Sequence, residues 1–321
     1  MVTMATKRKK IWMWIIGTVL LLVLLFFLLA AAWAWKSQQS ARAMPSVGKG
    51  RLELYPQFRS QFVPPRDVAV WVPEGYRTGD SCCVLYMHDG NMLFDASTTW
   101  NHQEWRVDEV MDSLMQAGSI RPCIVVGIYN TDDRLNEYYP DKTWQEVSED
   151  SRRKADTTLL HGDAYLQFVV MELKPFIDER YRPLTARENT FMMGSSMGGL
   201  ISLYALCEYP QVFGGVACLS SHLSMAHLPN GVDGQPWATG FRDYVMKHLP
   251  EANGSLIYMD HGTEDFDADY GPYQEQLDSA IAAKGWDNGH YLSRVFSGHG
   301  HNETCWANRL HEPLQFLLNK K

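Results

Sequence analysis

Apolar and polar positions alternate along most of the chain in two periods, one typical of strands and one typical of helices. Residues 67–72 alternate, and residues 83–88 and 123–128 are almost continuously apolar, as in strands that are buried on both faces. Further strands are expected at 190–193, 215–219, 255–259 and 291–296, and helices at 163–181, 197–208, 273–283 and in a last segment to about 319. This order predicts an α/β fold with a mainly parallel central sheet and helices on both faces. Functional residues are then expected at the carboxyl ends of the strands.

The N-terminal region has a different pattern. Residues 11–35 contain no charged side chain, and tryptophans stand near both ends of the run. At about 1.5 Å per residue this segment can cross a ~30 Å hydrocarbon core, so it predicts one transmembrane helix. The basic residues 7–10 before it predict a cytoplasmic N-terminus and a periplasmic or extracellular domain. The alternative is a cleaved signal peptide, with small residues at positions 41 and 43, although the apolar run exceeds the usual length of about 7–15 residues.

Three parts of the chain follow from this pattern. Residues 1–35 form a basic tail and membrane anchor, residues 36–50 a polar linker, and residues 51–321 one catalytic domain. The net charge of −8 gives no indication of nucleic-acid binding. Six cysteines in an exported chain raise the question of disulfides, but Cys83, Cys123 and Cys218 stand in apolar strand-like runs. Buried free thiols are therefore an equal alternative, and no pairing is predicted.

Residues 194–198 read GSSMG and match the pattern G-x-S-x-G. An apolar strand precedes this motif and a helix rich in leucine and alanine follows it, which is the setting of a nucleophile elbow. The spacing makes Ser196 the nucleophile rather than Ser195. The motif fits neither a dinucleotide-binding loop nor a P-loop. The oxyanion hole is expected to use the backbone N–H groups of Met197 and, from the loop after residues 83–88, of Asn91.

The base and its acid follow from chain order. In folds with this elbow the order is Ser, Asp or Glu, then His, which leaves His299, His301 and His311 after the last strand. His311 falls inside the expected final helix. The acid should follow the strand at 255–259, where several carboxylates compete: Asp265 is the first choice, Asp267 the second and Asp260 the third.

Metal sites are the alternative interpretation of these residues. The spacing Asp265-x-Asp267-x-Asp269 resembles the start of a calcium loop, but its glycine comes one place late, and position twelve is Gln276 rather than Glu. A zinc site at residues 299 and 301 lacks a specified third ligand. The sequence therefore predicts neither a metal nor another cofactor.

Four features resemble the putative-esterase branch of the α/β-hydrolases, which includes feruloyl, acetylxylan and enterochelin-type esterases. They are residues 70–76 (VWVPEGY), 86–91 (YMHDGN), 194–199 (GSSMGG), and 262–265 (GTED) followed by 301–306 (HNETCW). The family's catalytic histidine precedes a tryptophan by five residues, which favours His301 with Trp306. The family's acid matches Asp265. Arg134 and Glu137 lie in a stretch similar to a recurrent family segment near the active site. They are expected first to form an ion pair that fixes this loop, and second to contact the substrate.

The resemblance implies an α/β-hydrolase fold and a serine carboxylic-ester hydrolase that works through an acyl-enzyme and a Ser-His-Asp triad. The substrate would be a small-molecule or glycan-linked ester, and no cofactor is implied. Two alternatives remain: an acyltransferase on the same fold, and a membrane-tethered binding protein without turnover. The sequence does not distinguish hydrolysis from transfer, nor does it identify the acyl group.

Overall fold

A computed structural model of the chain describes residues 14–15, 17–19, 21–28, 44–153, 157–225 and 234–320. The chain forms two compact units, Met1–Met44 and Pro45–Lys321. Within the first unit, residues 14–15, 17–19 and 21–28 are helical and exposed. Across the described ranges, no helix combines the length and the apolar character that a membrane crossing needs. Much of the expected anchor at 11–35 and most of the expected linker at 36–50 lie outside the described residues.

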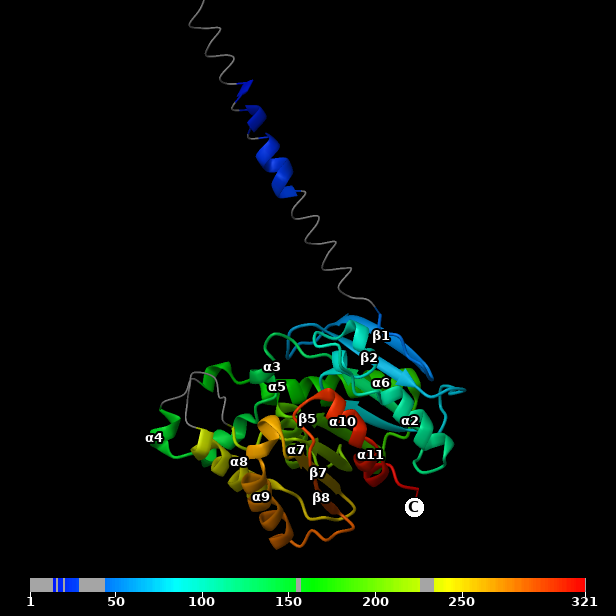
Figure 1. Cartoon of the computed structure of the whole chain (residues 1–321), viewed down its shortest axis with the longest axis vertical. Coiled ribbons are helices and arrows are strands. Elements are labelled where there is room, and N and C mark those ends of the chain that lie inside the picture. The colour runs from blue at the N-terminus through cyan, green and yellow to red at the C-terminus, as the bar shows by residue number, and fades with distance from the viewer. Residues whose placement is uncertain are drawn as a thin grey trace, which may run out of the picture. The chain divides into compact units, whose positions relative to one another are not determined.

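The second unit is built on one eight-stranded sheet (Figure 1). Its strands are β1 (Arg51–Phe58), β2 (Arg66–Val72), β3 (Cys83–Met87), β4 (Cys123–Ile128), β5 (Thr190–Ser195), β6 (Gly215–Leu219), β7 (Leu256–Gly262) and β8 (Tyr291–Phe296). Their spatial order is β1-β2-β4-β3-β5-β6-β7-β8. Only the β1–β2 and β2–β4 pairs are antiparallel. The other six strands, in the spatial order β4-β3-β5-β6-β7-β8, are therefore parallel to one another.

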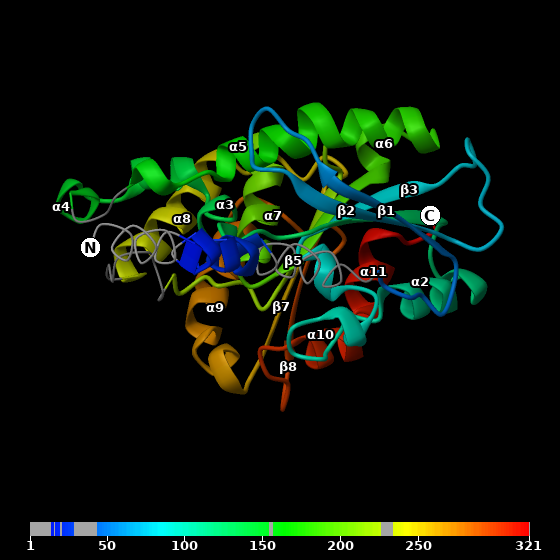
Figure 2. The ribbon, with the colours of Figure 1, turned by 90° about the horizontal axis from the view of Figure 1, so that it is seen from above.

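Helices cover both faces of this sheet. They are α2 (Val107–Gln116), α3 (Arg134–Glu137), α4 (Glu149–Arg152), α5 (Gly162–Gln167), α6 (Lys174–Tyr181), α7 (Met197–Glu208), α8 (Gly234–His248), α9 (Gly271–Ala283), α10 (Glu303–Arg309) and α11 (His311–Leu317). A π-helical turn, Phe168–Leu173, joins α5 to α6. Helices α5 and α6 lie on one side of the sheet, and α2, α10 and α11 on the other (Figure 2).

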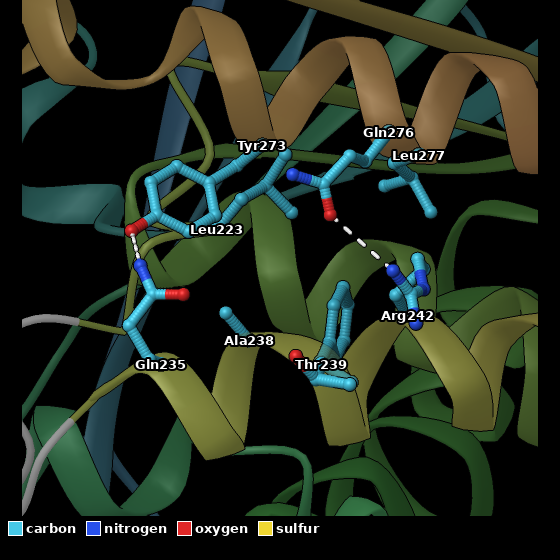
Figure 3. Close-up of a pocket in the computed structure, with 9 residues that line it drawn as sticks. Leu223, Gln235, Ala238, Thr239, Arg242, Tyr273, Gln276 and Leu277 are labelled. Atoms are coloured by element: carbon cyan, nitrogen blue, oxygen red, sulfur yellow. Dashed lines mark hydrogen bonds between the residues drawn. The ribbon is translucent and has the colours of Figure 1, made fainter.

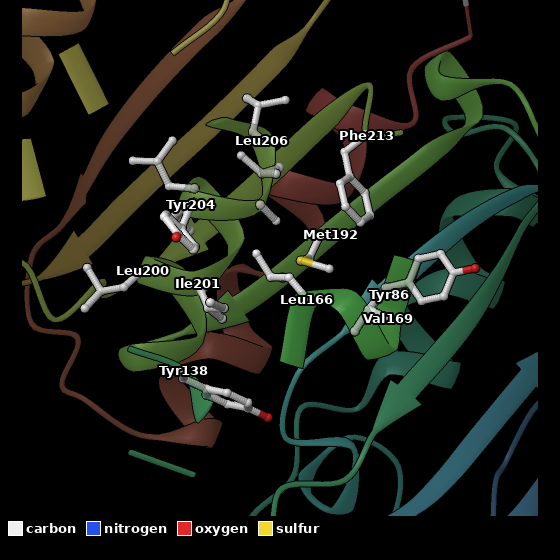
Figure 4. Close-up of a cluster of buried hydrophobic side chains, with 14 of the residues drawn as sticks. Tyr86, Tyr138, Leu166, Val169, Met192, Leu200, Ile201, Tyr204, Leu206 and Phe213 are labelled. Carbon is white, nitrogen blue, oxygen red and sulfur yellow. The ribbon is translucent and has the colours of Figure 1, made fainter. Parts of the chain in front are cut away.

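Two hydrophobic cores result from the alternation of side chains along each strand. In β3, Val84 and Tyr86 enter the core under α5, α6 and α7, whereas Leu85 and Met87 enter the core under α2, α10 and α11. Figure 4 shows part of the first core, where Tyr86 of β3 lies beside Val169 of the π-helical turn and the cluster continues to residues of α7. Because both faces are covered, these strands are almost fully buried, which explains their continuous apolar sequences.

The predicted α/β fold with a mainly parallel sheet is confirmed, and most expected elements agree with the observed ones to within a few residues. The order of the strands reverses between β3 and β5, because β4 lies on one side of β3 and β5 on the other. At such a switch point the loops leave the sheet in opposite directions and open a crevice. Residues 88–92 and Ser196 follow these two strands directly.

Candidate active site

Ser196 occupies a strained turn between β5 and α7. Its backbone has φ 57° and ψ −122°, a combination that L-residues adopt only where the surrounding structure enforces it. Hydrogen bonds enforce it here: Ser196 N–H donates to Leu219 C=O (3.0 Å), and His222 N–H donates to Ser196 C=O (3.2 Å). A Cβ at Gly194 would lie 2.7 Å from His88 Cδ2, so only glycine fits before the serines. The local structure is thus the strand–turn–helix that the motif predicts.

His301 lies after β8, immediately before α10, and contacts a carboxylate. Its Nδ1 is 2.6 Å from Asp267 Oδ1. An ionised carboxylate can only accept hydrogen bonds, so Nδ1 carries the hydrogen and Nε2 keeps a lone pair. Phe266, Tyr270 and Trp306 surround the imidazole edge-to-face, with ring centroids 5.7, 5.7 and 5.1 Å away. Because the neighbouring rings are aromatic, the orientation of the imidazole is set by its contact with Asp267.

The carboxylate that contacts His301 belongs to Asp267, the second choice of the sequence analysis, and not to Asp265, the first choice. Strand β7 runs to Gly262, three residues beyond the expected end, and a 3₁₀ turn follows at Asp265–Asp269. With three residues per turn, positions 267 and 270 share the inward face. Asp267 and Tyr270 are buried, whereas Asp265 is exposed and its carboxylate lies against Gly300. Position 265 therefore faces away from the imidazole.

Asp267 is held in its ionised form. Burial alone would raise the pKa of this carboxyl, but hydrogen bonds from His301, Ser220 and the backbone N–H of Gly262 outweigh it. The net result is a pKa below the ordinary value. The third candidate, Asp260, lies inside β7 and pairs with Arg309 at 3.0 Å.

The expected oxyanion donors occupy two loop–helix junctions. Met197 is the first residue of α7, so its N–H is one of the donors without a partner inside the helix. Asn91 lies in the 3₁₀ turn Gly90–Met92 after β3. A Cβ at Gly90 would lie 2.4 Å from the carbonyl carbon of Gly127, so this turn packs directly on β4. Both junctions flank the switch point between β3 and β5.

The expected ion pair between Arg134 and Glu137 is wrong. Arg134 instead makes a two-pronged contact with Asp89, at 2.6 and 2.8 Å. Glu137 pairs with Arg66 in the core, where both side chains are almost completely buried. The two residues are three positions apart on α3 and each side chain meets a partner from another segment. These two ion pairs attach α3 to β2 and to the loop that carries Asn91.

Three histidines other than His301 make different contacts. His88 Nδ1 lies 2.8 Å from the hydroxyl of Tyr165, and burial lowers the pKa of His88 to about 3, so it stays neutral. His299 Nδ1 lies 3.3 Å from the carbonyl oxygen of Cys305. His311 opens α11 with its Nε2 3.7 Å from Glu312. Of these side chains and His301, it is His301 that meets a buried carboxylate.

Sequence reasoning missed several residues around this centre: Ser220, His222, Tyr270 and Arg309. Ser220 and His222 follow β6, so their place after a parallel strand was a signal that went unused. His222 Nδ1 lies 2.7 Å from the Tyr270 hydroxyl. Arg309 offered no signal, because it falls inside the final helix expected from the sequence, where a cation usually faces solvent.

Two hollows on the described part of the domain are lined by other residues than Ser196, Asp267 and His301. A cavity of about 20 Å³ lies between α8 and α9, and Leu223 borders it. Two hydrogen bonds cross this space, one from Gln235 to Tyr273 and one from Arg242 to Gln276 (Figure 3). A cavity of that size fits one water molecule. A larger hollow of about 630 Å³ lies near the amino ends of β5, β6 and β7, opposite the candidate site.

Within the described ranges, no group of three or more His, Cys, Asp or Glu side chains is arranged to hold a metal ion. All six cysteines are free thiols in the structure.

Comparison with known proteins gives three findings. The model of the family described as "Putative esterase" matches residues 61–317. Two uncharacterized Bacillus subtilis (strain 168) proteins, YbbA and YjcH, are 28% and 25% identical over 156 residues, which is 48% of this chain. The matched stretch is 56% and 55% of those proteins, so the chain spans about half the length of the curated relatives it matches.

Solved structures share the fold. A ferulic acid esterase superposes with a TM-score of 0.63 at 20% identity, over 84% of this chain and 98% of that one. The enterobactin esterase of Shigella flexneri gives 0.60 at 18% identity, over 86% and 62% of the two chains. A ferulic acid esterase of Anaeromyces mucronatus gives 0.61 at 17%, over 86% and 93%.

Proposed function

Since the chain belongs to the putative-esterase family, we propose that it is a serine esterase that acts through Ser196, His301 and Asp267. The observation that supports this proposal best is the contact between His301 Nδ1 and the buried Asp267 carboxylate, on the loops after β8 and β7. Ser196 stands in its strained turn after β5 in the same sheet. The three residues thus follow parallel strands at one edge, in the chain order that this fold uses.

The chemistry proceeds in two stages. His301 Nε2 takes the proton of Ser196 as the serine oxygen attacks the ester carbonyl, and the backbone N–H groups of Met197 and Asn91 stabilise the oxyanion. Asp267 stabilises the imidazolium that forms. His301 then gives the proton to the departing alcohol, which leaves an acyl group on Ser196. Water, deprotonated by His301, releases the acid and restores the serine.

The substrate class we propose is an aromatic ester. The structural relatives include a ferulic acid esterase in complex with ferulic acid and an enterobactin esterase in the presence of 2,3-dihydroxy-N-benzoylglycine, and both of these ligands contain an aromatic ring. We further propose that residues 11–35 cross a membrane once, with the basic residues 7–10 in the cytoplasm and the catalytic domain in the periplasm or outside the cell.

The domain Pro45–Lys321 is expected to hydrolyse esters without the preceding residues, because every residue in the proposed mechanism lies in this unit. The measurement is a panel of short-chain, aromatic and siderophore-type esters, with the released acid quantified against the full chain in detergent. Free acid at a comparable rate supports the proposal. A folded domain that releases no acid from any ester argues against an esterase, and acyl groups recovered on an added alcohol instead of water indicate a transferase.

Chelation should leave the rate unchanged, because the serine is activated by an imidazole and needs no Lewis acid. Prolonged treatment with EDTA, followed by dialysis and assay with one ester, measures this. A loss of rate that added calcium or zinc restores would contradict this prediction. It would support the calcium loop at residues 265–269 or the zinc site at His299.

A further inference from the structure

A buried charge cluster lies behind the proposed acid. It consists of Ser220 directly after β6, Asp260 in β7, Asp267 in the 3₁₀ turn and Arg309 at the end of α10. Each of these four residues is at most 1% exposed. The mechanism uses only Asp267, and burying three further polar side chains is costly unless they compensate one another.

The hydroxyl of Ser220 has a defined direction. It accepts hydrogen bonds from Trp306 Nε1 (2.9 Å) and Arg309 Nη2 (2.7 Å), two groups that can only donate. Both lone pairs are then occupied, so the hydroxyl hydrogen points to Asp267 Oδ2. The carboxylate oxygen that faces away from His301 is therefore fixed by Ser220 and by the backbone N–H of Gly262.

The guanidinium of Arg309 lies between the carboxylates of Asp260 and Asp267 and is closer to that of Asp260. Its Nη2 is 3.0 Å from Asp260 Oδ1 and 3.7 Å from Asp267 Oδ2. Asp260 also accepts hydrogen bonds from the Tyr258 hydroxyl (3.0 Å) and the Ser220 backbone N–H (3.3 Å). Burial raises the pKa of Asp260, and the adjacent guanidinium opposes that shift.

The net charge of the cluster follows from this pairing. Asp260 compensates Arg309, so Asp267 keeps its full negative charge for His301. With a neutral imidazole the cluster carries one negative charge, and with the imidazolium it carries none. The proton transfer from Ser196 therefore brings the net charge of this buried cluster to zero. Coulomb interactions are stronger in such a site than in water, so this neutralisation favours the transfer.

We propose that Asp260 and Arg309 are positioning residues that keep this cluster at one net negative charge until His301 takes up the proton of Ser196. The inference rests on the proposed function. Another titratable side chain in contact with the imidazole is Tyr270 from the 3₁₀ segment, and it stays unchanged in the variants below.

Asp260→Asn tests the charge balance. Without Asp260, the charge of Arg309 faces Asp267 alone and opposes protonation of His301, so the acid limb of the kcat/KM–pH profile should move to lower pH by about one unit. The double variant Asp260→Asn/Arg309→Gln removes both charges and should return the limb to its wild-type position. Asp269→Asn, which removes an exposed carboxylate from the same turn, is the matched control and should leave the limb unchanged.

A purely structural role for these residues predicts the opposite pattern, in which both variants lose rate without moving the limb. An Asp260→Asn profile that overlays the wild-type profile overturns the proposal, because Asp260 would then be uncharged at rest. If Asp260→Asn alone does not fold, the double variant is used for the test, because it leaves neither Arg309 nor Asp260 as an unpaired buried charge. A displaced acid limb in the kcat/KM–pH profile of the double variant contradicts the proposal. Absence of hydrolysis by the wild-type protein would instead refute the proposed function.

Discussion

Replacing Ser196 by alanine is expected to abolish ester hydrolysis, with a fall in kcat of about 10⁶-fold, the scale of nucleophile removal in other serine hydrolases. Alanine leaves no oxygen to form the acyl-enzyme, while the strained turn and the hydrogen bonds of its backbone to Leu219 and His222 can persist. The measurement is the initial rate at saturating concentrations of one activated ester, together with a thermal melt that shows the variant is folded.

Ser195→Ala is the matched control for that experiment. Ser195 is the last residue of β5, its side chain is buried, and it pairs in register with Leu219 of β6. Its hydroxyl plays no part in the mechanism, so the variant should keep most of the wild-type rate. Equal loss in both variants, or full activity of Ser196→Ala, would place the nucleophile elsewhere.

Replacing Asp267 by asparagine is expected to lower kcat by roughly 10²–10⁴-fold with little change in KM, as for orienting acids in other triads. The amide carries no charge to stabilise the imidazolium, and its NH₂ group can force the wrong tautomer on His301. The hydrogen bonds from Ser220 and Gly262 hold the side chain in place, so the loss is one of chemistry rather than of folding. Steady-state kinetics with one ester measure both constants.

Asp265→Asn is the comparison for this second variant. Asp265 is exposed and lies against Gly300, so its replacement should cost less than about tenfold. A variant of Asp265 that is crippled while Asp267→Asn remains active would restore the original assignment from the sequence. Mild effects in both would mean that His301 works without a dedicated acid.

The parallel strands were predictable from sequence because burial on both faces leaves a direct trace. Residues 123–128 are apolar throughout, and they coincide with β4. Strand β1 was missed for the opposite reason: it is a half-exposed antiparallel edge strand with Pro56 inside it. Helix α8 was missed as well, since its first half contains Gly234, Pro236 and Gly240, which are poor helix formers.

A local motif was enough to predict the candidate nucleophile, Ser196. The carboxylate that contacts His301 depends on contacts between distant segments and could not be predicted in this way. The turn at Ser196 depends on its immediate neighbours and can be recognised from five residues. The choice between Asp265 and Asp267 depends on where β7 ends and on the phase of the following 3₁₀ turn. The Arg134–Asp89 and Arg66–Glu137 pairs join segments 45 and 71 residues apart, a distance over which no spacing rule operates.

The central claim is that Ser196 forms a covalent acyl intermediate. Its most direct test is to react the wild-type domain with a fluorophosphonate and to map the adduct by peptide mass spectrometry, with unreactive denatured protein as the blank. The account predicts one phosphonylated residue, Ser196, with hydrolysis lost in proportion to labelling. An adduct on Ser195 or on any other residue, or hydrolysis that continues in fully labelled protein, would contradict it.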